Sequence, residues 1–372
     1  MTYRNEFALQ DDIIYLNHAA VSPWPKRTVD AVKFFAEQNG YQGSLAYPQW
    51  LQTEQQLRHQ LAALINAPSG DDIALVKNTS EALSFVAYGL PWQSGDNVVS
   101  SNQEFPSNRI VWESLTPQGV ELRQADLDSH DSPEDALFAL VDERTRLIAI
   151  SSVQYASGLQ MDLVRIGEFC RNHGILFCVD AIQSLGAVRF DVQAIQADFV
   201  AADGHKWMMG PEGLGVFYCR PELRRQLRLS QFGWHMIESV GDFDRLEWEA
   251  ASSARRFECG SPNMLAIHAL NASLSLLNET GMVKVETLVQ DNSNFLIGKL
   301  TSIGMNVVTP SDPLRHAGIV SFASPDGDNV VIFENLLAAG VFCAYRRGNI
   351  RFSPHFYTPR HKLEHALRLL GG

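Results

Sequence analysis

The chain lacks any uninterrupted apolar run that approaches the roughly 20 residues of a membrane-spanning helix. It also lacks a polybasic run, and its 30 basic residues are outnumbered by 42 acidic ones, which gives a formal net charge of −12. Nucleic acids and anionic membrane surfaces are bound mainly by an excess of lysine and arginine. We therefore expect no nucleic-acid partner and no membrane partner.

Cysteine is scarce and forms no C-x-x-C pair. The five cysteines are scattered through the chain, at Cys170, Cys178, Cys219, Cys259 and Cys343. An odd number of thiols in apolar surroundings is typical of reduced proteins rather than of disulfide-linked ones. The first six residues contain no apolar secretory segment either. These features predict a cytoplasmic protein, and no metal is expected in its site.

The dinucleotide-binding fingerprint G-x-G-x-x-G is missing as well. Residues 210–215 contain three glycines and a proline, but not at that spacing. A nicotinamide cofactor is therefore not supported. The segment is instead expected to form a tight loop.

Strand-like and helix-like segments alternate along the 372 residues, which is typical of α/β architecture. Residues 163–170 repeat apolar side chains at helical spacing, and Gly174 suits a C-cap. With a strand on each side, they predict a right-handed crossover between parallel strands. The clearest strand candidates are residues 73–77, 97–100, 147–151, 175–179, 198–202 and 214–219.

A long amphipathic pattern begins after Pro262 and ends at Gly281. It predicts a helix that links the large domain to a smaller C-terminal α+β unit. That unit is expected to contain strands near residues 318–322 and 340–342 and a last helix near residues 362–370.

Lys206 and Asp180 indicate a particular chemistry. Lys206 follows the apolar segment 198–202 and precedes the glycine-rich loop, where it could form a Schiff base with an aldehyde cofactor. Asp180 follows the apolar strand 175–179; taken alone, it could be a helix N-cap. A site for pyridoxal phosphate (PLP) requires this pair, a lysine and a carboxylate that keeps the pyridine nitrogen protonated.

Further polar residues follow strands at the same edge of the sheet, where open α/β sheets bind their ligands. Thr79 and Ser80 open an expected helix, and a helix N-terminus is a suitable phosphate site. After the strand 147–151, the spacing leaves open whether Gln154 or Tyr155 faces the cofactor. The remaining candidates at this edge are Gln183 and His205.

The order of these residues resembles the class V aminotransferases, a group of fold-type I PLP enzymes that includes cysteine desulfurases, kynureninase and isopenicillin N epimerase. The resemblance extends from Asn17 to Arg351, nearly the whole chain. The motifs that match are Thr79-Ser80, Glu104-Phe105-Pro106-Ser107, Asp180-x-x-Gln183, Gly204-His205-Lys206 and Gly260-Ser261-Pro262-Asn263.

The resemblance implies the fold as well as the cofactor. The α/β chain would have a large PLP-binding domain, residues 16–260, with a mostly parallel seven-stranded sheet between helices. Residues 261–372, together with residues 1–15, would form a smaller C-terminal α+β domain. The cofactor would be pyridoxal 5'-phosphate.

The resemblance also implies roles for the cofactor-binding residues. Lys206 would bind the cofactor covalently and move protons, Asp180 would pair with the pyridine nitrogen, and Gln183 would hydrogen-bond the phenolic oxygen of the ring. Phe105 matches an aromatic residue that stacks on the ring, although it could also be a core residue. The phosphate would be held by Thr79, Ser80 and His205.

Two more roles follow from the resemblance. Gly260 and Ser261 match a segment that reaches the phosphate of a neighbouring subunit, which implies a homodimer with shared sites. Arg351 resembles the arginine that receives the carboxylate of an amino-acid substrate. Alternation with apolar neighbours favours Arg351 over Arg346 and Arg347, which could recognise a second acidic group instead.

The chain departs from the desulfurases in two places. Asp203 stands where many of them have a phosphate-binding serine, and its charge would repel a phosphate unless it faces away. Desulfurases also have a catalytic cysteine on a loop shortly before the arginine, whereas residues 344–350 contain none. Cys343 lies in an apolar run and is expected to be buried and inert. Persulfide chemistry on the protein is therefore not expected.

The residues leave several reactions open: transamination, C–S elimination, epimerisation and kynureninase-like hydrolysis. We favour transamination at the α-amino group of a small amino acid, because it needs no residue beyond those found. A non-enzymatic, PLP-binding regulatory module is disfavoured, because the fold begins near Asn17 and leaves no room for a basic DNA-binding segment.

Overall fold

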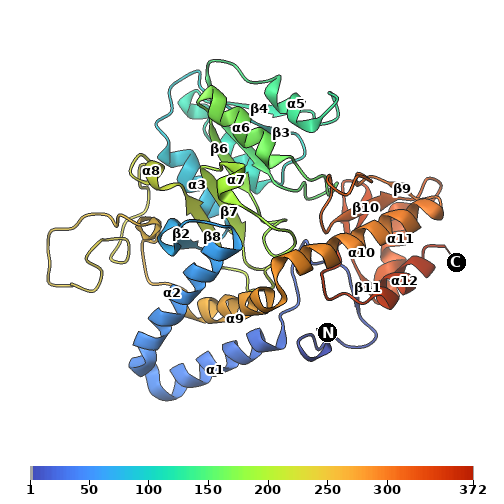
Figure 1. Cartoon of the computed structure of the whole chain (residues 1–372), viewed down its shortest axis with the longest axis horizontal. Helices are drawn as coiled ribbons and strands as arrows, with labels where there is room; N and C mark the ends of the chain where they lie inside the picture. The colour runs from blue at the N-terminus through green and yellow to red at the C-terminus, as the bar shows by residue number, and fades with distance from the viewer. Residues whose placement is uncertain (1–2, 372) are drawn as a thin grey trace.

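A central β-sheet between helices forms the larger part of the molecule (Figure 1). The computed structural model describes residues 3–371, and within them this sheet has seven strands. Strand β8 is antiparallel to both of its neighbours, β2 and β7, and the other pairings in the sheet are parallel, so the expected α/β fold with a mostly parallel seven-stranded sheet is confirmed. In spatial order the strands are β2 (Ile73–Val76), β8 (Gly215–Cys219), β7 (Phe199–Asp203), β6 (Leu176–Asp180), β5 (Thr145–Ser151), β3 (Asn97–Ser101) and β4 (Glu121–Ala125).

Successive side chains of the central strands enter two different hydrophobic cores, as the two-residue period of a strand requires. Phe177 and Val179 of β6 belong to the core under α2, α6 and α9, whereas Cys178 belongs to the core under α3 and α4. Apolar runs are therefore needed on both faces, which made these strands recognisable in the sequence. The edge strand β4 is partly exposed and polar, and it was missing from the strands we expected.

Helices cover both faces of this sheet, and α9 packs against α1 and α2. Within the described part of the chain, no helix is long and apolar enough to cross a membrane. The helices are α1 (Lys26–Gln42), α2 (Tyr47–Leu64), α3 (Thr79–Gly89), α4 (Ser107–Glu113), α5 (Pro133–Phe138), α6 (Leu163–His173), α7 (Val192–Ile195), α8 (Pro221–Arg224) and α9 (Met264–Thr280). Short 3-10 turns are η1 (Tyr3–Asn5), η2 (Gly43–Ala46), η3 (Gly70–Asp72), η4 (Thr116–Gln118) and η5 (Ala254–Phe257).

The C-terminal part forms a smaller α+β unit, which α10 joins to the rest (Figure 1). The helix expected after Pro262 is α9, and Gly281 ends it as the sequence indicated; α10, which follows at once, was not anticipated. The elements of the unit are α10 (Met282–Ser302), β9 (Asn306–Val307), β10 (Val320–Ala323), α11 (Asn329–Ala338), β11 (Val341–Phe342), β12 (Ala344–Arg346), β13 (Asn349–Phe352) and α12 (Arg360–Arg368).

An N-terminal segment joins this smaller unit. Strand β1 (Ile14–Tyr15) pairs in parallel with β11, while β12, β13, β10 and β9 form an antiparallel sheet in that order. The domain division at residues 260 and 261 stays a prediction, and its ends at residues 1, 2 and 372 lie outside the described residues.

The turn that follows β6 depends on one glycine. Gly186 has a φ of +94°, and a Cβ at this position would lie 2.3 Å from the backbone oxygen of Trp207. We expect Gly186→Ala to lower the free energy of unfolding by about 2–4 kcal/mol, because the side chain is strained at this φ and the backbone must move. Urea unfolding followed by circular dichroism measures the change.

Gly298→Ala is the matched control. Gly298 lies in α10, and a Cβ there would meet nothing within 4 Å. Alanine should therefore stabilise the helix by roughly 0.5–1 kcal/mol. Equal stability of the two variants would contradict the close approach at Gly186.

Candidate active site

A cavity of about 340 Å³ lies where β6 and β7 end at the carboxyl edge of the sheet. Residues from both parts of the chain line it, because the strand ends of the large sheet meet the β12–β13 hairpin of the smaller unit. The lining includes eight residues that the sequence predicted for the site: Thr79, Ser80, Phe105, Asp180, Gln183, His205, Lys206 and Arg351.

One end of the cavity is suited to a phosphate. The N-terminus of α3 opens there, and Asn78, rather than Thr79 or Ser80, is its N-cap, accepting a hydrogen bond from the backbone N–H of Glu81 at 2.9 Å. Thr79 is buried, and its Oγ1 has no hydrogen-bond partner among the described residues. A free hydroxyl beside helical N–H groups is a ready anion site.

Asp203 lines this cavity and does not face away from it. Its Oδ1 lies 3.0 Å from Nδ1 of His205, and both side chains are largely buried. The two atoms are close but do not form a hydrogen bond, and both are buried without another partner among the described residues. The position of Asp203 in the cavity wall therefore differs from the outward orientation that a phosphate there would require.

Lys206 and Asp180 occupy the deep part of the site. Lys206 is 9% exposed and Asp180 is 2% exposed. The pKa of Lys206 is lowered to about 8, mainly by burial; the charge of Asp180 opposes this shift and that of Arg351 adds to it. Burial, reinforced by the charge of Glu104, raises the pKa of Asp180. Such a lysine can be a neutral nucleophile near physiological pH.

The pH dependence of Lys206 can be measured directly. Because only the neutral amine reacts with acetic anhydride, acetylation of Lys206 in the cofactor-free protein should rise with pH and level off above about pH 8. A solvated lysine would keep gaining reactivity up to about pH 10.4. Trace labelling with peptide mass spectrometry separates the two profiles, and a plateau near pH 10 would contradict the shift.

Aromatic side chains cover the lysine. The ring centre of Phe105 lies 5.5 Å from Nζ of Lys206, and Phe105 is 42% exposed, so it is a cavity residue rather than a core residue. Tyr155 also lines the cavity and meets Phe105 edge to face, at 5.2 Å between ring centres.

Of the two alternatives in this segment, Tyr155 lines the cavity and Gln154 does not. Gln154 is fully buried, and its Nε2 donates to Glu104 at 2.9 Å. Glu104 also accepts from the backbone N–H of Ser151 at 3.0 Å. The Oε1 of Gln154 is buried without a hydrogen-bond partner among the described residues, so a contact of Gln154 with the cofactor stays a prediction.

Gln183 lies in the cavity wall with its amide already bonded. Its Nε2 donates to the backbone oxygen of Ala19 at 3.0 Å, and its Oε1 accepts from the indole N–H of Trp207 at 2.9 Å. This arrangement ties an N-terminal segment to the loops after β6 and β7. Hydrogen bonding of Gln183 to a cofactor ring stays a prediction.

Two arginines of the hairpin complete the site. Arg351 in β13 is 2% exposed, and its guanidinium donates to the backbone oxygen of Tyr155 at 2.7 Å. Arg346 in β12 lines the same cavity and was not chosen from the sequence. Ser261 is exposed and lies outside the cavity of this single chain, so its role toward a second subunit stays a prediction.

Cysteine does not contribute to this cavity among the described residues. Cys343 is buried as expected, and burial raises the pKa of its thiol to about 12. Strands β12 and β13 are joined only by Arg347 and Gly348, with φ values of 50° and 83°, which is a two-residue hairpin turn.

These features fit PLP. The cavity offers an amine of lowered pKa, a buried carboxylate, an unpartnered hydroxyl at a helix N-terminus and a guanidinium for a carboxylate. A parallel α/β sheet with this site at its carboxyl edge defines a fold-type I PLP-dependent enzyme.

Comparison with known proteins gives the family. Residues 14–358 match the family described as Aminotransferase class-V. A probable cysteine desulfurase of Methanothermobacter thermautotrophicus is 34% identical, with 97% of this chain and 94% of that protein covered. The chain therefore belongs to the class V aminotransferase family, and its cofactor is pyridoxal phosphate.

Solved structures agree with this assignment. The apo structure of a cysteine desulfurase from Thermococcus onnurineus has a TM-score of 0.88 at 25% identity, with 99% of this chain and 96% of that chain covered. A variant of C-DES with glycine covalently linked to its PLP cofactor has a TM-score of 0.90 at 23% identity, with 98% of each chain covered. The second similarity concerns the fold alone.

Proposed function

We propose that this protein is a PLP-dependent C–S lyase that eliminates sulfur from Cβ of a small amino acid and releases it directly, without storing it on a cysteine of the protein. Two observations support this proposal. Relatives that share almost the full length are named probable cysteine desulfurases, and the cavity contains Lys206 and Arg351 but no thiol among its described lining residues. The two-residue turn at Arg347 and Gly348 leaves no loop on which such a thiol could sit.

The reaction balances without an oxidant. An S-substituted cysteine and water give a thiol or persulfide, pyruvate and ammonium. The Cα proton is removed, the Cβ–S bond breaks with its electron pair on sulfur, and water releases the nitrogen as ammonium. When bound, PLP supplies the electron-withdrawing system that makes the Cα proton acidic.

The residues of the chain would position the substrate and move its proton. Arg351 would hold the α-carboxylate, because its buried guanidinium has donors to spare. Lys206 would take the Cα proton and could return it to the departing sulfur, since its lowered pKa suits both directions of transfer. Asp180 would stay ionised beside the protonated pyridine nitrogen.

Product analysis tests the proposal. The holoenzyme is mixed with L-cystine or L-cysteine, without a keto-acid acceptor, and pyruvate, ammonia and sulfur products are followed over many turnovers. Continuous release of all three supports a lyase. A single keto acid per site, with the cofactor left in its amine form, would overturn it.

Transamination, which we favoured from the sequence, is the second candidate. The cavity suffices for it, because Lys206 can both remove and return a proton and no residue is needed to assist a leaving group. The names of the relatives do not support it, and for that reason the lyase is placed first.

We also propose that the protein is a cytoplasmic homodimer. The long excursion between α8 and η5, at the left of Figure 1, exposes Phe243 (77%), Leu246 (90%) and Trp248 (56%). Exposed apolar groups gathered in one segment are typical of a surface that a partner covers. All five cysteines are free thiols. Analytical ultracentrifugation measures the subunit number.

A further inference from the structure

Two guanidinium groups meet in the active-site cavity. Arg346 lies on β12 and Arg351 on the neighbouring β13, and both line the cavity that contains Lys206. Nε of Arg351 is buried without a hydrogen-bond partner among the described residues. Among the described residues, the guanidinium of Arg346 donates only to the backbone oxygen of its own neighbour, Tyr345, at 2.8 Å.

The acidic residues of the cavity do not neutralise these arginines. Asp203 lies next to His205, and Asp180 accepts from the backbone N–H of Ile182 at 3.1 Å. Glu212 is exposed at the cavity, and within residues 3–371 it forms no ion pair with either arginine. Both positive charges therefore lie at one cavity, and neither has an ion pair with a carboxylate among the described residues.

This arrangement costs free energy. Burial lowers the pKa of Arg351 to about 9, and the nearby charge of Arg346 adds to this shift. An unpaired charge in a largely buried site is stabilised only when an anion arrives. The cofactor phosphate belongs at the other end of the cavity, at the N-terminus of α3, so the anion must come from the substrate.

We propose that the substrate has two anionic groups, with Arg351 binding the α-carboxylate and Arg346 binding a second acidic group on the sulfur substituent. This inference rests on the proposed site for an amino acid. One carboxylate would neutralise only one of the two guanidinium groups, whereas a second acid balances the charge. The substrate class is thus S-substituted cysteines whose substituent ends in a carboxylate or a similar acid.

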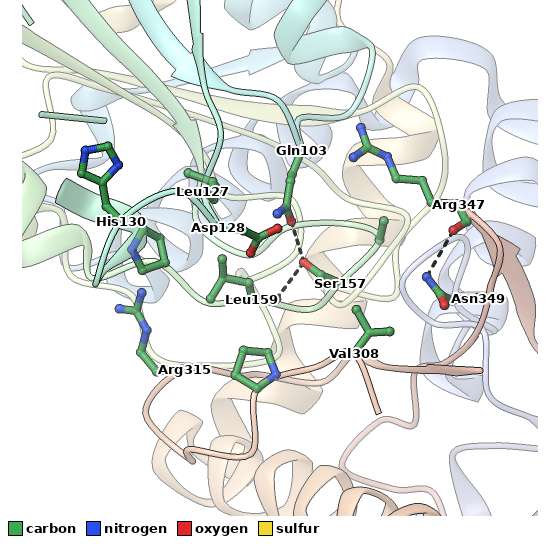
Figure 2. A pocket seen from close by; sticks show the side chains of 13 residues that line it. Gln103, Leu127, Asp128, His130, Ser157, Leu159, Val308, Arg315, Arg347 and Asn349 are labelled. Carbon is green, nitrogen blue, oxygen red and sulfur yellow. Dashed lines mark hydrogen bonds between the residues drawn. The ribbon is translucent and has the colours of Figure 1, made fainter. Parts of the chain in front are cut away.

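Arg347 provides an internal control. It follows Arg346 directly, but the hairpin turn directs it into a neighbouring cavity of about 620 Å³ (Figure 2). Figure 2 shows its side chain there with Ser157 and Asn349. Its guanidinium donates to the backbone oxygen of Asn102 at 2.9 Å. Arg347 does not line the active-site cavity, although its guanidinium lies 5.9 Å from the ring centre of Tyr155 in the cavity wall. A change at Arg347 therefore removes an equal charge from the same hairpin outside the cavity.

A pair of isosteric substrates tests the proposal. S-carboxymethyl-L-cysteine and S-carbamoylmethyl-L-cysteine have the same shape and differ in one charge. We expect the holoenzyme to prefer the acid by at least about 10-fold in kcat/KM, since hydrogen bonds to charged groups are worth roughly 1.5–3 kcal/mol. Arg346→Gln should lower kcat/KM for the acid by about 10- to 100-fold and change that for the amide less than about 3-fold. Arg347→Gln should change neither.

A binding measurement tests the second acid site without requiring that the enzyme turn over a substrate. Glutarate and its monoamide, glutaramate, are titrated into the holoenzyme while the visible absorption of the cofactor is followed. If glutarate binds more tightly than glutaramate, and Arg346→Gln abolishes this difference, the second acid site is supported. Failure to cleave either cysteine derivative would count against the proposed lyase activity but not against this site. Equal handling of acid and amide in both experiments, or an equal loss for both in Arg346→Gln, would overturn the inference.

Discussion

Lys206→Ala is expected to lower kcat by about 10⁴-fold or more, because one side chain both binds the cofactor and moves the substrate proton. Burial holds the pKa of this lysine near 8, so its amine is available as a nucleophile and as a base. The alanine removes both functions together. Steady-state assays of keto-acid release measure the loss.

A covalent readout accompanies the assay. Borohydride reduction of the native holoenzyme should leave the mass of the cofactor on the peptide that contains Lys206, and on no peptide of Lys206→Ala. Lys299→Ala, at an exposed position in the last turn of α10, is the control and should keep full activity and labelling. Near-normal turnover of Lys206→Ala would refute the assignment of the site.

The fold was predictable because its central strands are buried on both faces. Residues such as those of β6 must then be apolar at every position, and such runs stand out in a sequence. Strand β4 lies at the edge of the sheet with exposed positions, and α10 follows α9 after a single glycine. Neither has the boundary or the pattern that would have revealed it.

The site was predictable where a strand fixes the position of a residue. Asp180 is the last residue of the buried strand β6, and Lys206 comes shortly after the buried strand β7. Their positions at the carboxyl edge of the sheet therefore depended only on the parallel topology. Gln154 and Tyr155 are adjacent in an irregular segment, where the direction of each side chain depends on a partner far away in the sequence. For Gln154 that partner is Glu104, 50 residues earlier.

The hairpin arginines show the same limit. Alternation in β13 indicated Arg351 correctly as a cavity residue, but it could not separate Arg346 from Arg347. Their separation is set by the positive φ of Arg347 and Gly348, which turns the chain between them. Arginine at positive φ is uncommon, so the residue type gave no indication of this turn.

Asp180→Asn should lower kcat by about 10³-fold while leaving the fold intact. Asparagine has the same shape and can keep the hydrogen bond from the backbone N–H of Ile182, at 3.1 Å in the native protein. It cannot carry the negative charge that holds a pyridine nitrogen protonated. Loss of one partner of a buried ion pair costs roughly 3–5 kcal/mol, which is a few hundred- to a few thousand-fold in rate.

Stability distinguishes this effect from damage to the fold. Burial raises the pKa of Asp180, so in the cofactor-free protein its ionised form opposes folding as the pH rises above the ordinary value of a carboxyl group. Cofactor-free Asp180→Asn should therefore unfold at the same urea concentration as the native protein, or a higher one, at pH 8. A lower midpoint would mean that the loss of activity is structural.

Asp198→Asn is the matched control, because it removes a buried carboxylate at the opposite edge of the same sheet. Asp198 accepts from the backbone N–H of Phe177 at 2.8 Å and pairs with Arg220 at 2.8 Å, far along the strands from the cavity. Burial also raises the pKa of Asp198, so its loss should leave the unfolding midpoint at pH 8 unchanged or higher, and kcat should stay within about 3-fold of the native value. If both aspartate variants lowered kcat equally, Asp180 would have no special role beside the cofactor, and the chemistry would have to depend on Lys206 and the arginines alone.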